Sequence, residues 1–247
     1  MTWRTLVSVG LLVLLPASLW AQTGLPTLTL GIGEANDPAE VSTAIQVLLV
    51  LTILSVAPAI LLMTTAFTRI VIVLSFVRQA IGTQQAPSNQ IVVGLALFLT
   101  FFIMAPVFSQ INQEALQPYL NEEISQDDAL ELAMEPMRQF MFSQVGEKDL
   151  QLLVDISGAE QPEAREDISM LTLIPAFMLS ELKRAFQMGF LLFVPFLMID
   201  MIVASILMAM GMMMLPPIIV SLPFKILLFV LVDGWSLVVG SLMQSFG

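Results

Sequence analysis

The sequence predicts an all-α integral membrane protein, and three observations carry that prediction. Hydrophobic residues make up 57% of the 247 residues and charged residues only 12%, whereas soluble domains have roughly 45–50% and about 25%. Uncharged apolar runs long enough to cross a hydrocarbon layer of about 30 Å recur along the chain. The sequence contains neither Cys nor His, which excludes disulfides, thiolate metal sites and a Ser-His-Asp triad.

The N-terminus has the layout of a secretory signal peptide. Met1–Arg4 is a short basic start, Leu6–Leu15 is apolar, and residues 16–21 read PASLWA, a small-residue cleavage region. We expect cleavage after Ala21, which makes residues 1–21 the signal peptide and residues 22–40 an exported leader. The alternative, an uncleaved anchor, has an apolar core too short to span a bilayer comfortably.

Residues 41–111 are expected to form a first apolar helical hairpin. Val41–Thr68 is free of charge, and a second uncharged stretch runs from Gln79 to Gln113. The connection between them, residues 64–89, carries Arg69 and Arg78 and no acid. Positive-inside bias places that connection in the cytoplasm.

Residues 112–184 are expected to form an acidic, helical, periplasmic domain. Between Asn112 and Asp167 there are fourteen acids and three bases, which accounts for the whole net charge of −11. A helix is predicted to begin at Ser125, with an acid three residues later, and to carry an apolar stripe at the regular helical spacing of Leu130, Met134, Met137 and Met141. Carboxylate pairs such as Glu122-Glu123 lack the spacing of a calcium loop, so a solvated face is the better interpretation. No basic stripe points to nucleic acid.

Residues 185–247 are expected to form a second apolar hairpin around a methionine-rich loop, MAMGMMMLPP, at residues 208–217. Three charges stand inside this apolar sequence, and such groups usually face a bundle interior and pair there. If the chain turns near Met212, Asp200 and Lys225 lie at equal depth, which favours a structural ion pair over a proton relay. The third charge, Asp233, has no assigned partner.

Each apolar run also contains proline, which predicts bent or broken helices that need neighbouring protein to satisfy their backbone. These residues are Pro58, Pro106, Pro195, Pro216, Pro217 and Pro223. The methionine-rich loop has two interpretations that stay open: a deformable constriction in a pore, or the packed core of the hairpin. The proline pattern indicates a subunit of something larger.

Where the acidic domain enters the third apolar run, three charged residues suggest a subunit interface. Glu181 is expected to reach a basic group on a neighbouring copy rather than Lys183 of its own helix. The alternative is that Lys183 and Arg184 anchor the helix at a membrane interface.

Two long blocks, PAFMLSELKRAFQMGF (Pro175–Phe190) and PFLMIDMIVASILMAMGMMMLPP (Pro195–Pro217), resemble the FliP/SctR family of type III secretion export gates. TAFTRIVIVLSFVRQAIG (Thr65–Gly82) fits the same family, and the resemblance covers nearly all of residues 41–247. The signal peptide and exported leader favour the flagellar branch over the virulence branch.

This resemblance implies a protein without catalytic residues, cofactor or metal. Five copies are expected to assemble with FliQ and FliR into a helical oligomer in the inner membrane at the flagellar basal body, with FlhA and FlhB as further partners. Unfolded flagellar subunits would pass along its axis, through a ring formed by Met212, Met213 and Met214.

Two other classes of protein are disfavoured. A secondary transporter coupled through Asp200 or Lys225 should contain internal repeats with broken helices at matching positions. No convincing repeat relates residues 44–108 to residues 186–240. An intramembrane hydrolase would need a Ser–Lys or paired-Asp arrangement, for which Lys225, Asp200 and Asp233 carry no motif.

Overall fold

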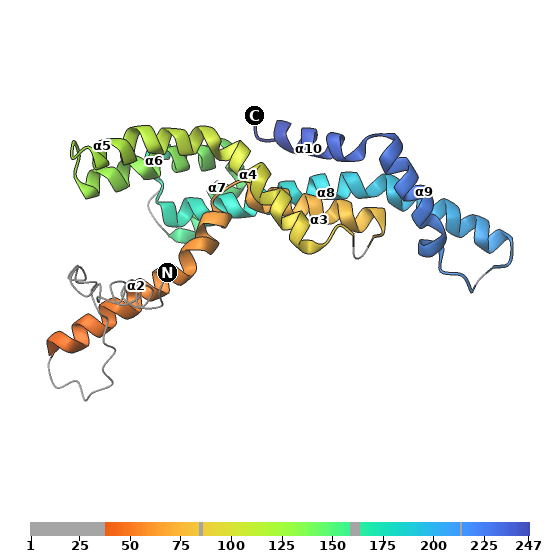
Figure 1. Cartoon of the computed structure of the whole chain (residues 1–247), viewed down its shortest axis with the longest axis horizontal. Coiled ribbons are helices and arrows are strands. Elements are labelled where there is room, and N and C mark those ends of the chain that lie inside the picture. The colour runs from red at the N-terminus through yellow and green to blue at the C-terminus, as the bar shows by residue number, and fades with distance from the viewer. Residues whose placement is uncertain (1–37, 84–85, 159–163, 213) are drawn as a thin grey trace, which may run out of the picture. The chain divides into compact units, whose positions relative to one another are not determined.

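A computed structural model describes residues 38–83, 86–158, 164–212 and 214–247, and these residues form helices and no strand (Figure 1). The predicted signal peptide, nearly all of the exported leader and Met213 lie outside the described residues. The helices are α2 (Pro38–Met63), α3 (Phe67–Ile81), α4 (Asn89–Ile111), α5 (Gln117–Leu120), α6 (Gln126–Gln144), α7 (Glu147–Ser157), α8 (Met170–Ala209), α9 (Pro217–Leu231) and α10 (Gly234–Gln244). A π-helical turn, Asn112–Leu116, joins α4 to α5, and a short 3-10 turn, Arg165–Asp167, precedes α8.

The chain divides into two units, Met1–Leu51 and Thr52–Gly247. In the first unit the described apolar side chains of α2, such as Leu48 and Leu49, are exposed except for the half-buried Val47. The second unit holds the rest of the described helices and both buried clusters of apolar side chains.

Three of the described helices are long and apolar enough to cross a membrane, in the segments Ile45–Met63, Asn89–Leu120 and Met170–Ala209. A fourth candidate is the pair α9 and α10, which meet at a bend of 63°. The all-helical class is therefore confirmed for the described residues, which contain three to four apolar segments of membrane length.

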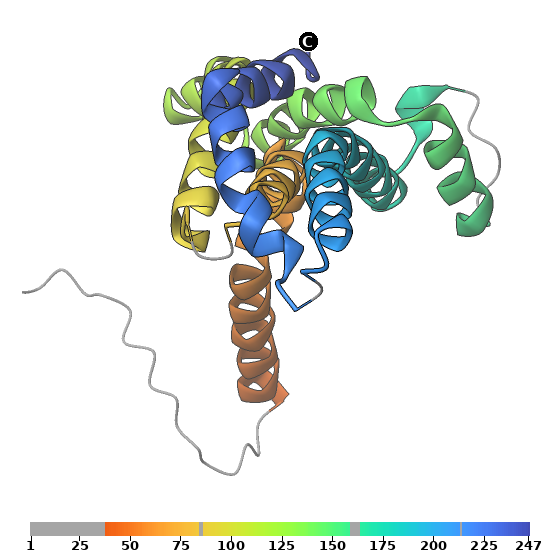
Figure 2. The same ribbon diagram turned by 90° about the vertical axis from the view of Figure 1, so that its right-hand side faces the viewer.

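Helix α3 forms the centre of the larger core, which corrects the prediction that residues 64–89 are only a connection. One side of α3 is buried at helical spacing, including Ile70, Val73, Leu74 and Val77. Figure 2 looks along this helix and shows it between α4, α8 and α9. Gly189 of α8 allows a close approach, because a Cβ at that position would lie 2.5 Å from Cδ2 of Phe76.

Arg69 therefore lies in the core of the second unit and is fully buried. A buried and paired arginine is not a free charge beside a lipid headgroup, so it cannot be counted toward a positive-inside sum. The cytoplasmic placement of residues 64–89 stays a prediction that rests on Arg78 and on the signal peptide.

The prolines do not break the helices in which they lie, which corrects the expectation of proline-broken helices. Helix α8 continues for 40 residues through Pro175 and Pro195, and across the boundary expected between residues 184 and 185. A proline inside a helix removes one backbone hydrogen bond, and packing against neighbouring helices retains the remaining turns. The 63° bend between α9 and α10 falls instead at Asp233, whose φ of 50° is left-handed.

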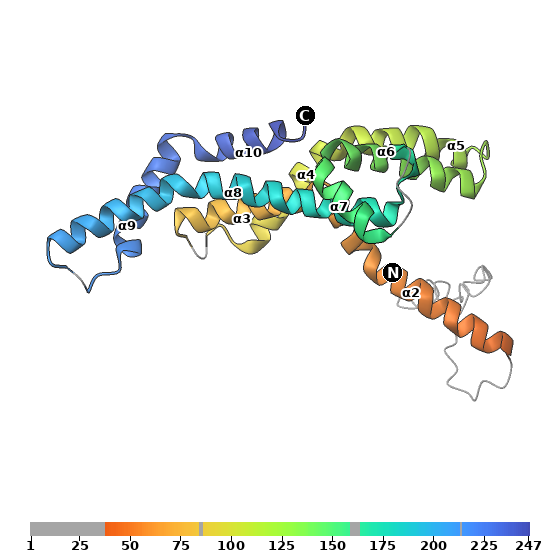
Figure 3. The same cartoon turned by 180° about the vertical axis from the view of Figure 1, so that it is seen from behind.

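The acidic segment packs α6 and α7 against the first turns of α8, as Figure 3 shows. Ser125 caps α6 as predicted, because its hydroxyl accepts a hydrogen bond from the backbone N–H of Asp128 at 3.3 Å. Helix α7 follows after the two residues Val145 and Gly146. A separate apolar cluster joins the three helices and consists of Met141, Leu150, Ile168, Leu173, Ala176 and Phe177.

The predicted apolar stripe of α6 is wrong in its first half. Leu130 and Met134 are exposed, whereas Pro136, Met141 and Gln144 are buried. The face turned toward α4 and the π-helical turn carries the small residues Ala129 and Ala133, which line a groove of about 410 Å³ there together with the exposed Leu130. Small residues allow close helix approach, and a periodicity based on large apolar residues overlooks them.

Candidate functional site

The hairpin of α8 and α9 brings Asp200 and Lys225 together as an ion pair. Nζ of Lys225 donates to Oδ2 of Asp200 at 2.6 Å, and the Ser221 hydroxyl donates to Oδ1. The Lys225 side chain is 4% exposed and that of Asp200 is 22% exposed. Asp200 lies nine residues before the end of α8 and Lys225 eight residues after the start of α9, or about 12–14 Å along each helix at 1.5 Å per residue.

Asp233 does not join this pair. It is exposed at the bend between α9 and α10, and the ion pairs between described residues do not include it. Its neighbour Gly234 makes the bend possible, since a Cβ there would lie 2.3 Å from the ring of Phe229.

The methionine-rich turn begins at a defined helix stop. Gly211 has a φ of 76° and donates its N–H to the carbonyl of Met208 at 3.0 Å, while the N–H of Met212 reaches the carbonyl of Leu207 at 2.9 Å. These two bonds are the Schellman pattern that ends a helix at a left-handed glycine. Pro217 then occupies the first position of α9, where a missing N–H costs nothing.

The described methionines of this turn are exposed. Met212 is 41% exposed and Met214 is 98% exposed, and just before the turn Met208 of α8 and the helix C-cap Met210 are each 60% exposed. They do not fill a hairpin core within this chain, so the core-filling interpretation has no support from their packing.

Glu181 has its partner in the same chain, which differs from the expectation of a pair between copies. Nε of Arg69 donates to Oε2 of Glu181 at 2.9 Å, and Nη2 donates to Oε1. Both side chains are fully buried. An ionised carboxylate in such a place needs a cation close by, and Arg69, which lies 112 residues away in sequence, is that cation.

Arg69 also ties the C-terminus to the core. Its Nη1 donates to the carbonyl and hydroxyl oxygens of Ser245 at 2.8 and 3.0 Å, and Nη2 donates to Oε1 of Gln144 at 3.0 Å. The guanidinium lies 3.7 Å from the centroid of the Phe246 ring, and Gln144 donates to the Phe246 carbonyl at 3.1 Å. All five N–H groups of the arginine are therefore used, and one side chain joins α3, α6, α8 and the chain end.

Lys183 and Arg184 lie beside this network and have different ion-pair and hydrogen-bond partners. The Lys183 side chain is 55% exposed, and its Nζ lies 3.8 Å from Oδ1 of Asp149. Arg184 donates from Nη1 to Oε1 of Gln144 at 3.1 Å. Their role at a subunit interface stays a prediction.

Sequence reasoning missed Arg69 and Gln144 as members of this cluster. The available signal was the position of Arg69 in a run of apolar residues with no acid nearby, where a charge needs a distant partner. The partner's identity depends on the packing of α3 along α8, which a single sequence does not reveal.

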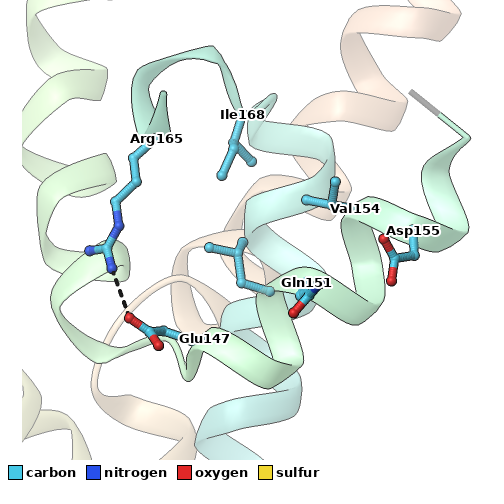
Figure 4. A pocket seen from close by; sticks show the side chains of 7 residues that line it. Glu147, Gln151, Val154, Asp155, Arg165 and Ile168 are labelled. Carbon is cyan, nitrogen blue, oxygen red and sulfur yellow. Dashed lines mark hydrogen bonds and ion pairs between the residues drawn. The ribbon is translucent and has the colours of Figure 1, made fainter. Parts of the chain in front are cut away.

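The acidic segment carries a small cavity of about 280 Å³, shown in Figure 4. Leu150, Val154 and Ile168 give it an apolar lining, and Arg165 pairs with Glu147 at 3.4 Å on its rim. Both partners are largely exposed, so the pair adds little to stability. Among the described residues no group of three or more His, Cys, Asp or Glu side chains could hold a metal ion.

The helices, the buried ion pairs and the membrane-length apolar segments define the class: a helical integral membrane protein with charged pairs inside its packed helices. The chain belongs to the FliP family, since a model of that family matches residues 50–242. This confirms the resemblance seen in the two sequence blocks.

Relatives from several bacteria agree with this assignment over most of the chain. Flagellar biosynthetic protein FliP of Bacillus subtilis (strain 168) is 58% identical over 217 residues, which cover 88% of this chain and 98% of that protein. The protein of the same name from Pectobacterium carotovorum subsp. carotovorum is 50% identical over 246 residues, 99% of this chain and 93% of that protein. The one from Caulobacter vibrioides (strain ATCC 19089 / CIP 103742 / CB 15) is 48% identical over 233 residues, 94% of this chain and 86% of that protein.

Proposed function

We propose that this protein is a channel subunit of the flagellar protein-export gate, through which unfolded flagellar subunits cross the inner membrane. The observation that carries the proposal is membership of the FliP family over residues 50–242, with relatives named flagellar biosynthetic proteins. A transport role needs no catalytic side chain, cofactor or metal.

Two features of the structure support a role in an assembly. The outward faces of α8 and α9 carry large exposed apolar side chains, among them Phe190, Met201, Ile219 and Leu231. Exposed apolar area on this scale is typical of contact with lipid or with other subunits. The exposed methionines at the hairpin tip offer a deformable apolar surface suited to a pore constriction.

The partners are part of the proposal. Further copies of this chain, FliQ and FliR would complete the channel, and FlhA and FlhB would deliver substrates to it. The acidic segment is proposed to face the periplasm, because the predicted signal peptide exports the N-terminus and the two candidate spans α2 and α4 then return the chain to that side.

The test is export in cells of the source bacterium that lack this gene. We expect these cells to lose secretion of rod and hook subunits into the medium and to lose motility, with both restored by a plasmid copy. Normal secretion in the deletion strain would refute the proposal. If the plasmid restores motility but none of the protein is found in the membrane fraction, the proposed location in the membrane is refuted.

A further inference from the structure

A polar cavity of about 610 Å³ opens where α3 ends against the hairpin of α8 and α9. Its charged lining residues are Arg78 in the last turn of α3, Asp200 on α8 and Lys225 on α9. Gln79 lines it too, and Phe193 and Ile218 add apolar surface. Neither the ion pair nor the methionine turn accounts for this cavity.

The charges in the cavity do not balance. Asp200 is bonded on both oxygens, by Ser221 and by Lys225, so its negative charge is already compensated by the lysine. Arg78 is half-buried, and the hydrogen bonds and ion pairs of the described residues include none to its guanidinium. One positive charge therefore remains without a counter-charge inside a partly enclosed space.

The two cations lie near the same end of α3. A Cβ at Gly82, the left-handed residue that ends α3, would lie 3.9 Å from Nζ of Lys225. Arg78 stands four residues earlier, about one helical turn from this point. Lys225 has three N–H donors and spends one on Asp200 at 2.6 Å, so it retains donors for a second anion.

We propose that this cavity binds the phosphate of an anionic phospholipid. A guanidinium offers two parallel N–H groups to a phosphate, a geometry that suits a phosphodiester well. The Gln79 amide and the Lys225 ammonium complete a set of donors from two elements. Basic pockets between membrane helices are the usual place for such headgroups.

The surroundings favour a lipid over a soluble anion. Ile218 is 61% exposed at the cavity and Ile219 beside it is 68% exposed, and both belong to α9, which forms a candidate membrane span together with α10. Acyl chains can cover these side chains while the phosphate enters the cavity. A free phosphate ion would leave this apolar surface in water.

The experiment measures lipid retention by the intact, detergent-extracted protein in native mass spectrometry. Phosphatidylglycerol and phosphatidylcholine are offered separately at equal concentration, and inorganic phosphate is offered in a third arm. We expect about tenfold greater retention of phosphatidylglycerol, the effect of one charge-assisted contact. Displacement of the lipid by millimolar phosphate would instead mean that the cavity takes free phosphate, and would refute the lipid assignment.

Three variants at two arginine positions separate the site from general charge effects. Arg78→Gln should abolish the preference for phosphatidylglycerol, whereas Arg78→Lys should keep part of it. Arg165→Gln removes the same charge from an exposed position in the acidic domain and should change nothing. Because Arg78 has no bonded partner among the described residues, its replacement should leave the amount of folded protein unchanged.

Two results would overturn the proposal. If Arg78 only offsets the partial negative charge at the C-terminal end of α3, retention will not depend on headgroup charge in any variant. If a carboxylate of another protein chain fills the cavity, Arg78→Gln will release a subunit from the assembly while lipid retention stays the same. Neither lipid retention nor subunit release depends on export, so these measurements test the lipid site separately from the proposed export function.

Discussion

At the scale of single residues, Arg69 is the side chain with the most connections in the second unit. Its five donors reach Glu181, Gln144 and Ser245, and its face lies over Phe246. A lysine carries the same charge but has no planar fork, so it cannot serve three acceptors in these directions at once.

Replacing Arg69 should therefore destabilise the protein more than its charge alone suggests. Arg69→Ala leaves the buried Glu181 carboxylate without a cation, which costs about 3–5 kcal/mol, and Arg69→Lys should cost a substantial part of that. The measurement is thermal unfolding of the detergent-extracted protein together with its abundance in the membrane. Arg165→Lys, at an exposed pair, is the control and should shift the melting temperature little. A stable Arg69→Ala variant would contradict the role given to the network.

The same substitution, glycine to alanine, is expected to have opposite effects on stability at two glycines in long helices. A Cβ at Gly189 would lie 2.5 Å from the Phe76 ring, whereas one at Gly94 meets nothing within 4 Å. Gly189→Ala should destabilise by about 1–3 kcal/mol because the core is overpacked. Gly94→Ala should be neutral or stabilise by roughly 0.5–1 kcal/mol, since alanine is the better helix former.

Unfolding midpoints of the two alanine variants, measured side by side, check this pair of predictions. Phe76→Leu in the Gly189→Ala background should recover part of the loss by removing the ring that clashes. Equal effects at both glycines would mean that α3 and α8 do not approach as closely as described.

At the scale of elements, the α8–α9 hairpin depends on the pair of Asp200 and Lys225. Each single reversal, Asp200→Lys or Lys225→Asp, places two like charges at a site where the pair is separated by 2.6 Å. The double reversal restores an attractive pair, so it should recover complex yield and export that each single change loses. The coupling expected for residues in contact is about 1–3 kcal/mol.

A proton relay predicts a different pattern at the same residues. Asp200→Asn would then stop export with the amount of assembled complex unchanged, and the double reversal would restore nothing. Blotting the assembled complex beside secreted hook protein distinguishes a structural pair from a relay.

The elements also show which features a sequence can reveal. Ser125 was found as a cap because a capping hydroxyl and its target lie three residues apart. Asp200 and Lys225 were found because a hairpin fixes equal depth on its two arms once the turn is known. Both inferences use only local geometry and helix rise.

Other features depend on packing between distant segments and could not be derived. Arg69 and Glu181 are separated by 112 residues, and their pairing needs α3 to lie along α8. The sequence predicts a connection at residues 64–89 because Arg69 and Arg78 stand there between two uncharged apolar stretches. The continuity of α8 through Pro195 depends on neighbouring helices, which proline propensity does not include.

At the scale of the whole molecule, the exposed surfaces decide where function lies. The buried ion pairs hold helices together, whereas the methionine turn, with Met214 98% exposed, is free to meet other copies or a substrate. A channel for unfolded chains must close around side chains of every size and hold back ions when empty. Unbranched, polarizable thioether chains adapt to such changes at low cost, and an apolar ring excludes ions by excluding water.

Replacing Met212, Met213 and Met214 together by Ala should therefore leave the complex assembled but make the membrane leak small ions, with slower growth when the gate is overproduced. Replacement of the same three by Leu keeps similar volume with less flexibility, so it should leak less while reducing export. The control is alanine at Met208, which belongs to α8 rather than to the turn and should leak less than the triple variant. Ion flux into cells and complex yield are measured in parallel. Because Met212 is 41% and Met214 98% exposed, their truncation removes little packing within the chain. A triple variant with less complex and no leak would show that these methionines hold subunits together and do not seal a pore.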